Sequence, residues 1–248
     1  MKPIRRAKGL KSTRQPAEPM TSHTRNHLLA ALACLLLWPA AALAHDISEA
    51  NRSFVESIDG PAFLPFFYLG AKHMVTGIDH VLYLIGVVFF LHRLRDVVLY
   101  VSMFTIGHSL TLMGGVLLGT GANPHIVDAI IGLSVAYKAF ENMGGFRKIG
   151  FSFDPRIAVF AFGLAHGLGL ATKLQDLAVS DNGLLVNLIG FNIGVEAGQV
   201  VVLAVVVTAL NLWRRAPSFG RTAFAANTIL LAAGLALAGY QITGYYAS

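Results

Sequence analysis

Two histidines and an aspartate lie inside an otherwise apolar stretch, HMVTGIDHVLYLIGVVFF, at residues 73–90. They are His73, Asp79 and His80. Ionisable side chains are costly in an apolar environment, and those found within membrane segments are functional candidates. Imidazole nitrogens and a carboxylate, without a thiolate, suit a divalent transition metal such as Ni²⁺, Zn²⁺, Co²⁺, Fe²⁺ or Cu²⁺. Asp79 can either ligate such an ion or orient a ligating imidazole.

Further polar groups occur near the middle of other apolar runs. His108 lies in FTIGHSLTL, His166 in FGLAHGLGLA and Glu196 in FNIGVEAGQV. We predict that these three side chains line one metal pathway together with His73, Asp79 and His80. The surroundings of this pathway are predicted to include four more residues: Asn192, Gln199, Asp128 and Glu141.

The spacing of the first two histidines predicts how an ion would meet them. On a continuous helix, His73 and His80 share one face and lie about 10 Å apart along the axis. His73 would then meet an ion arriving from outside before the midplane residues do. Two alternatives stay open for these polar groups. A histidine can simply hydrogen-bond between helices, and Lys138 can pair with either Glu196 or Glu141.

The composition indicates that these residues are positioned by membrane helices. Of the 248 residues, 55% are hydrophobic and 13% are charged, whereas soluble domains carry roughly 25% charged residues. The net charge of +6 does not indicate a nucleic-acid partner, because most of the basic residues lie before the first apolar run or in short loops. A span must be helical to satisfy its backbone within the bilayer. We therefore predict an all-α, polytopic membrane bundle of about six transmembrane helices, near 69–91, 97–119, 124–143, 157–174, 183–212 and 222–246.

The first apolar run, residues 28–44, is too short to cross a bilayer of roughly 30 Å. Basic residues precede it and Ala42-Leu43-Ala44 ends it, a pattern typical of a cleaved signal peptide. We predict a signal peptide over 1–44, with Met20 as an alternative start. Cleavage would leave His45 at the amino terminus, where its α-amine and imidazole together can chelate a metal. An exported segment with an interfacial aromatic stretch is expected at 45–68, and the bundle at 69–248.

The charge of the short loops predicts the orientation, because inner loops are enriched in Lys and Arg. We place the mature N-terminus on the exported side of the inner (plasma) membrane. Eight basic residues then fall on the inner side: Arg93, Arg95, Arg147, Lys148, Arg156, Arg214, Arg215 and Arg221. The outer side holds three: Arg52, Lys72 and Lys173.

The chain resembles the HupE/UreJ family of membrane proteins. The resemblance rests on His73-x5-Asp79-His80, on FTIGHSLTL around His108, on Ala165-His166-Gly167 and on FNIGVEAGQ. It implies a nickel permease associated with hydrogenase or urease accessory functions, and thus with metalloenzyme maturation proteins. It also implies metal-handling roles for His73, Asp79, His80 and His166. One departure is Phe162, which stands where HupE proteins proper tend to carry a second histidine. This difference weakens the implied specificity for nickel more than the other implications.

Three functions are compatible with these residues. We favour a transition-metal permease or channel over an enzyme. The alternative enzyme is an intramembrane metal-dependent hydrolase, in which the same His/Asp cluster holds a metal that activates water. A metal sensor or chaperone partner is the third. The chain has no Walker-type nucleotide-binding motif, so transport would be passive, ion-coupled or driven by another subunit.

Overall fold

The computed structural model describes residues 55, 57–151, 153–175 and 182–247, and every regular element in these ranges is a helix. The predicted all-α class is thereby confirmed. The expected signal peptide and His45 lie outside the described residues. The helices are α3 (Phe63–Thr76), α4 (Ile78–Val88), α5 (Leu94–Leu118), α6 (Pro124–Asn142), α7 (Gly145–Lys148), α8 (Pro155–Gln175), α9 (Leu184–Trp213) and α10 (Phe219–Ala247).

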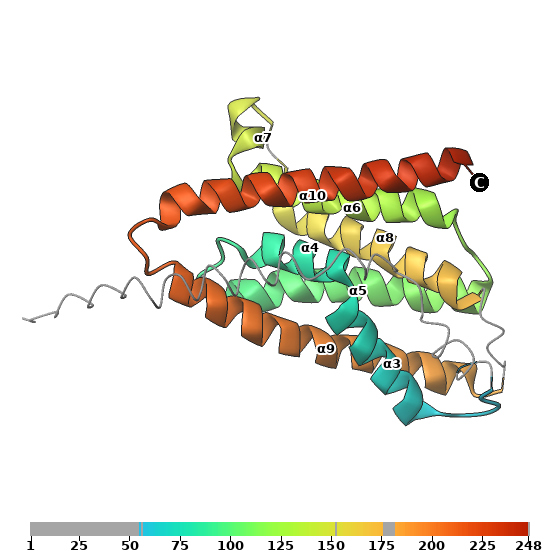
Figure 1. The fold of residues 1–248 in the computed structure, drawn as a ribbon. Coiled ribbons are helices and arrows are strands. Elements are labelled where there is room, and N and C mark those ends of the chain that lie inside the picture. The colour runs from blue at the N-terminus through green and yellow to red at the C-terminus, as the bar shows by residue number, and fades with distance from the viewer. Residues whose placement is uncertain (1–54, 56, 152, 176–181, 248) are drawn as a thin grey trace, which may run out of the picture.

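The long helices form three closely packed pairs, α3 with α9, α5 with α8, and α6 with α10, and the short helix α4 lies among them (Figure 1). Glycines at four-residue spacing permit the close approach. A Cβ at Gly190, Gly194 or Gly198 of α9 would collide with backbone carbonyls of α3, and Gly163 and Gly167 stand in the same relation to α5. The four-residue spacing of these glycines thus marks the helix faces that pack closely, α9 on α3 and α8 on α5.

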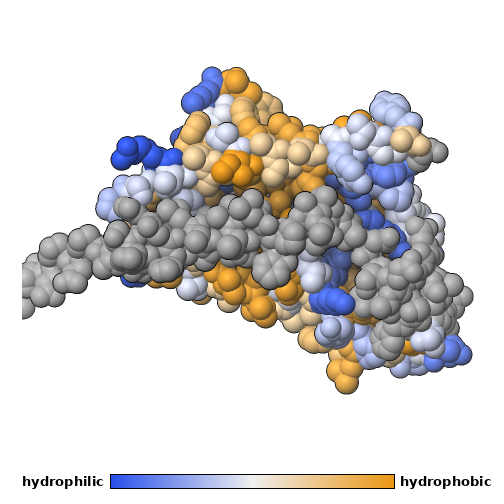
Figure 2. Space-filling model, viewed as in Figure 1, coloured by the Kyte–Doolittle hydropathy of each residue, from blue (hydrophilic) through white to orange (hydrophobic). Residues whose placement is uncertain are grey.

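Four helices, α5, α8, α9 and α10, are each long and apolar enough to cross a membrane. The helix α6 packs along α10, but it carries Asp128, Lys138 and Glu141. Figure 2 shows hydrophobic residues over the middle of the visible face and hydrophilic ones toward its two ends. Large side chains such as Leu110 and Val200 are exposed, as expected of a surface that lipid covers.

A break at Gly77 divides the first predicted span, so the expectation of one continuous helix over 69–91 is wrong. Gly77 separates α3 from α4, with φ −70° and ψ 99°. The bend brings the ring centroids of His73 and His80 to 4.9 Å, instead of the roughly 10 Å expected along a continuous helix. A Cβ at residue 77 would lie 2.9 Å from both the His73 carbonyl oxygen and His80 Nδ1. The bend therefore leaves room only for glycine.

The helix α3 begins at Phe63, earlier than the expected start at residue 69. The aromatic stretch expected at the membrane interface forms its first turns and packs along α9. The buried side chain of Asn187 on α9 holds this beginning in place. Its Oδ1 accepts a hydrogen bond from the Ala62 amide at 2.6 Å, and its Nδ2 donates to the Gly60 carbonyl at 3.1 Å.

Three connections, α4–α5, α6–α8 and α9–α10, lie at the same end of the bundle (Figure 1). We call it the arginine-rich end, because these connections and the adjoining first helical turns carry Arg93, Arg95, Arg147, Lys148, Arg156, Arg214, Arg215 and Arg221. Arg214 closes α4 there: its Nη2 donates to the carbonyls of Val88 and Phe89, at 2.8 and 2.7 Å. A cation at a helix C-terminus both satisfies free carbonyls and complements the helix dipole.

Candidate metal centre

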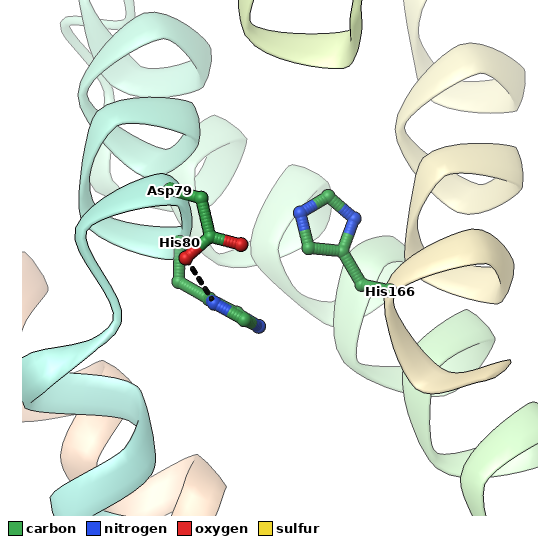
Figure 3. Close-up of side chains that lie close together, drawn as sticks. All are labelled: Asp79, His80 and His166. Atoms are coloured by element: carbon green, nitrogen blue, oxygen red, sulfur yellow. Dashed lines mark hydrogen bonds and ion pairs between the residues drawn. The ribbon is translucent and has the colours of Figure 1, made fainter. Parts of the chain in front are cut away.

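The side chains of Asp79, His80 and His166 lie together inside the bundle (Figure 3). Asp79 and His80 stand in the first turn of α4, and His166 faces them from α8. One ligand atom from each residue, namely two imidazole nitrogens and a carboxylate oxygen, all come within 4.8 Å of one another. None of the three residues is more than 3% exposed. This group can offer three protein ligands to a single divalent ion.

Hydrogen bonds at Nδ1 orient both imidazoles of this group. The Nδ1 of His166 lies 2.7 Å from the Phe162 carbonyl oxygen. Because a carbonyl oxygen only accepts, Nδ1 must donate, and the lone pair of the neutral ring is at Nε2. The Nδ1 of His80 lies 2.9 Å from Asp79 Oδ1. A carboxylate or carbonyl partner of this kind fixes the ring of a metal-ligating histidine and raises its basicity.

Two more of the predicted histidines adjoin this group. The ring of His73 lies 4.9 Å from that of His80, centroid to centroid, and the ring of His108 lies 6.4 Å from it. His108 is 1% exposed, and neither of its ring nitrogens hydrogen-bonds to any described residue. The structure therefore gathers all four predicted intramembrane histidines, although only His80 and His166 join Asp79 in the tight group.

The close contact of α5 with α8 brings His166 to this position. A Cβ at Gly167 would collide with the His108 carbonyl oxygen, so the glycine beside His166 allows the two backbones to touch. The Thr111 hydroxyl on α5 donates to the Leu164 carbonyl on α8 at 2.7 Å. The glycines around His166 in the sequence thus serve helix packing at the site itself.

The polar residues of α9 do not join the histidine group. Glu196 is exposed and lines a groove between α5 and α9. Gln199 is buried in the wall of the same groove, where its Oε1 accepts a hydrogen bond from the Thr105 hydroxyl at 2.8 Å. Asn192 is buried and donates to the Leu188 carbonyl of its own helix at 3.0 Å.

The remaining two predicted acids form ion pairs. Glu141 accepts from Lys138 Nζ at 2.9 Å, one of the two pairings left open for that lysine. Asp128 lies 3.0 Å from Lys173 Nζ. Both carboxylates are thereby neutralised by a neighbouring ammonium, and neither belongs to the group of Asp79, His80 and His166.

Sequence reasoning missed Tyr83. Its ring lies 5.4 Å from that of His166, centroid to centroid. The side chain has 0% exposure, and its hydroxyl has no hydrogen-bond partner among the described residues. The spacing in the sequence could have indicated Tyr83 as a neighbour of the site, because it follows His80 by three residues and so lies on the same face of the helix.

Comparison with known proteins places the chain in a family. The family model described as HupE / UreJ protein matches residues 49–248. No curated protein and no solved structure matches the chain. The four apolar helices and the family match together indicate a multi-pass membrane protein. Because the match covers most of the sequence, the chain belongs to the HupE/UreJ family.

Proposed function

We propose that the protein is a permease or channel for a divalent transition metal, which passes through the group formed by Asp79, His80 and His166. One observation carries the proposal: three metal-ligating side chains converge within 4.8 Å in the interior of a membrane bundle. They lie where the first crossing breaks into α3 and α4. Discontinuous membrane helices commonly form the substrate sites of transporters, because their ends point free backbone groups at an ion.

Nickel is the cargo that we propose, because the chain belongs to a family associated with nickel handling. The donor set supports a borderline metal but does not single out one. Two imidazoles and one carboxylate also suit Zn²⁺, Co²⁺, Fe²⁺ or Cu²⁺. The neighbouring rings of His73 and His108 offer further nitrogens along the way of the ion.

We place the protein in the inner membrane with its arginine-rich end inside, in accordance with the preference of inner loops for basic residues. Six crossings follow from this arrangement: α3 with α4, then α5, α6, α8, α9 and α10. The mature N-terminus would be exported after removal of the signal peptide, and His45 could capture ions there. Metalloenzyme maturation proteins are the proposed recipients of the ion.

Metal uptake into vesicles tests the proposal. The full chain, purified without a polyhistidine tag, is reconstituted into vesicles that contain a fluorescent metal chelator. Ni²⁺ added outside should enter with the wild type, and Zn²⁺, Co²⁺, Fe²⁺ and Cu²⁺ in parallel vesicles should define the selectivity. His80→Ala should reduce entry to the rate of protein-free vesicles, while His92→Ala, in the exposed α4–α5 connection, should leave it unchanged. A folded H80A protein that transports at the wild-type rate contradicts the proposal.

The hydrolase alternative uses the same three side chains and needs a substrate to be cleaved. No observation on the described residues favours it, and the family match favours metal handling. We therefore do not propose it.

A further inference from the structure

An aromatic layer closes the bundle between the histidines and the arginine-rich end. Three of the four histidines have an aromatic residue about one helical turn closer to that end: Tyr83 for His80, Phe104 for His108 and Phe162 for His166. The ring of Tyr83 lies 5.3 Å from that of Phe104 and 5.9 Å from that of Phe162. Tyr83 and Phe104 are at most 2% exposed. Directly beyond the histidines this layer therefore offers a cation three rings and a single polar atom, the hydroxyl of Tyr83.

Polar groups continue instead toward α9. His108 has two buried ring nitrogens without a hydrogen-bond partner among the described residues. Thr105 lies one helical turn further along α5 toward the arginine-rich end, and its hydroxyl donates to Gln199 Oε1. Gln199 is 2% exposed, yet its Nε2 has no partner among the described residues. A buried polar atom of this kind costs about 1 to 3 kcal/mol unless water or a ligand satisfies it.

Thr105 and Gln199 line the groove between α5 and α9, and His108 lies one helical turn from Thr105, behind this lining. Its volume is about 650 Å³, and its wall runs from Leu94 near the arginine-rich end to Thr105 and Glu196 near the middle of the bundle. The groove exists because α5 packs on α8 and α9 packs on α3, so that the two helices barely touch each other. Among the described residues that line it, Glu196 is the one with a charged side chain.

We propose that the metal ion leaves the histidines sideways, past His108 and the Thr105–Gln199 pair, and enters the α5–α9 groove, where Glu196 receives it. This exit rests on the transport function proposed above. A carboxylate exposed on the middle of an apolar helix is costly in lipid, but it is favourable where a hydrated cation passes. The oxygen ligands of Glu196, Gln199 and Thr105 hold a borderline metal less tightly than imidazoles do, which favours release.

The amide of Gln199 can serve a cation without losing its anchor. A threonine hydroxyl both donates and accepts. When the amide turns over, Nε2 donates to the Thr105 hydroxyl, and Oε1 takes the buried position that Nε2 holds in the structure, where it can ligate a passing cation. Gln199 thus offers an oxygen ligand on the way from the histidines to Glu196.

Measuring both Ni²⁺ transport and metal binding on the same variants distinguishes a defect in the proposed exit from a defect in the histidine site. Glu196→Gln removes the charge but keeps the shape, and Ala204→Trp fills the groove from α9. Both should lower Ni²⁺ entry into vesicles about tenfold or more, as expected when a favourable step is lost. Binding of Co²⁺ to the purified protein, followed by its visible absorption, should stay within about twofold. Ala232→Trp, at an exposed position of α10, is the matched control and should transport as the wild type does.

The possible results are decisive in each direction. If E196Q and A204W bind Co²⁺ and transport Ni²⁺ at the wild-type rate, the sideways exit is wrong while the transport function stands. If the wild type binds metal but moves none, the proposed transport is wrong and the exit falls with it. If E196Q loses Co²⁺ binding as well, Glu196 belongs to the first site rather than to an exit.

Thiol labelling tests the hydration of the groove without relying on transport. Cys34 is the single cysteine of the chain, so a C34S background allows one cysteine to be introduced at a time. Ser102→Cys lies in the groove wall and should react with a membrane-impermeant methanethiosulfonate reagent. Ala232→Cys on α10 should not. Equal lack of reaction at both positions means that lipid fills the groove, and it overturns the exit.

Discussion

Asp79 and His80 are neighbours in sequence, and their side-chain contact is unusual for a helix. Successive residues of a helix point about 100° apart and do not normally face each other. Here the pair begins α4 directly after the bend at Gly77, and Asp79 Oδ1 reaches His80 Nδ1 at 2.9 Å. The carboxylate is therefore placed to set the ring of His80, whether or not it also ligates the ion.

Asp79→Asn tests this role with little change of shape. The amide can still hydrogen-bond to the ring, but it lacks the negative charge of the carboxylate. Metal affinity should fall about 10- to 100-fold, the range seen when such partners of a ligating histidine are lost. Calorimetric titration of the purified protein with Ni²⁺ measures the change. Asp154→Asn, in an exposed connection, is the control, and equal affinities for the two variants would show that Asp79 has no such role.

The candidate metal-ligating histidines were predictable from the sequence, but the partners of the acidic residues were not. The histidines were recognisable as site candidates, because an imidazole within an apolar run is rarely found without a role in hydrogen bonding or metal ligation. For Lys138 the sequence offered two carboxylates, and the structure pairs it with Glu141, three residues along the same helix. Glu196 was expected beside the histidines, yet it lies on the outward side of α9. The rotation of each helix about its axis decides which side chains face one another. That rotation depends on the packing of several helices and cannot be read from one segment of the sequence.

At the scale of the elements, the short helix α4 positions the candidate site. The bend at Gly77 sets its beginning, and two side chains from distant parts of the chain hold its other end. Asn142 Nδ2 donates to the Gly86 carbonyl at 2.8 Å, and Arg214 binds the carbonyls of Val88 and Phe89. It was predictable from the sequence that glycines spaced four residues apart serve close helix packing. The bend was not, because glycine within an apolar run more often serves close packing.

Gly77→Ala should disrupt the site while leaving most of the bundle intact. The added Cβ would lie 2.9 Å from His80 Nδ1 and from the His73 carbonyl oxygen, closer than carbon tolerates, and both belong to the bend. We expect loss of Ni²⁺ binding, measured by calorimetry, with helix content preserved by circular dichroism. Gly114→Ala is the control, because a Cβ there would have no atom within 4 Å from any other described helix. Unchanged binding in G77A would mean that the bend does not define the site.

Arg214→Ala should weaken the other end of α4. It removes hydrogen bonds from a charged donor to two carbonyls, which costs about 1 to 3 kcal/mol, and the melting temperature in detergent should fall. Arg214→Lys should restore part of the loss, because an ammonium can still reach a carbonyl but lacks the fork of the guanidinium. Arg215→Ala, on an exposed neighbour, should melt as the wild type does. If R214A also melts at the wild-type temperature, the cap contributes nothing measurable to the stability of the fold.

For the molecule as a whole, charge and hydropathy agree on one arrangement. The hydrophobic middle and hydrophilic ends seen in Figure 2 fit a bilayer across the bundle. The basic connections gather at one end, and α10 ends at the opposite one (Figure 1). On the positive-inside preference we propose that the arginine-rich end faces the cytoplasm. The carbonyl cap of Arg214 lies at that end, and the groove of α5 and α9 begins there at Leu94.

The location of the C-terminus tests this arrangement. With six crossings and an exported N-terminus, an alkaline phosphatase fused after Ser248 should be active, since that enzyme needs an oxidising compartment for its disulfides, and a green fluorescent protein at the same place should be dark. The same two reporters inserted after Pro217, in the α9–α10 connection, should give the opposite pair of signals, because that connection belongs to the arginine-rich end. A fluorescent C-terminal fusion would show that the number of crossings is odd. In that case α6, which carries three charged residues, or the short pair α3 and α4 would be the segment that does not cross.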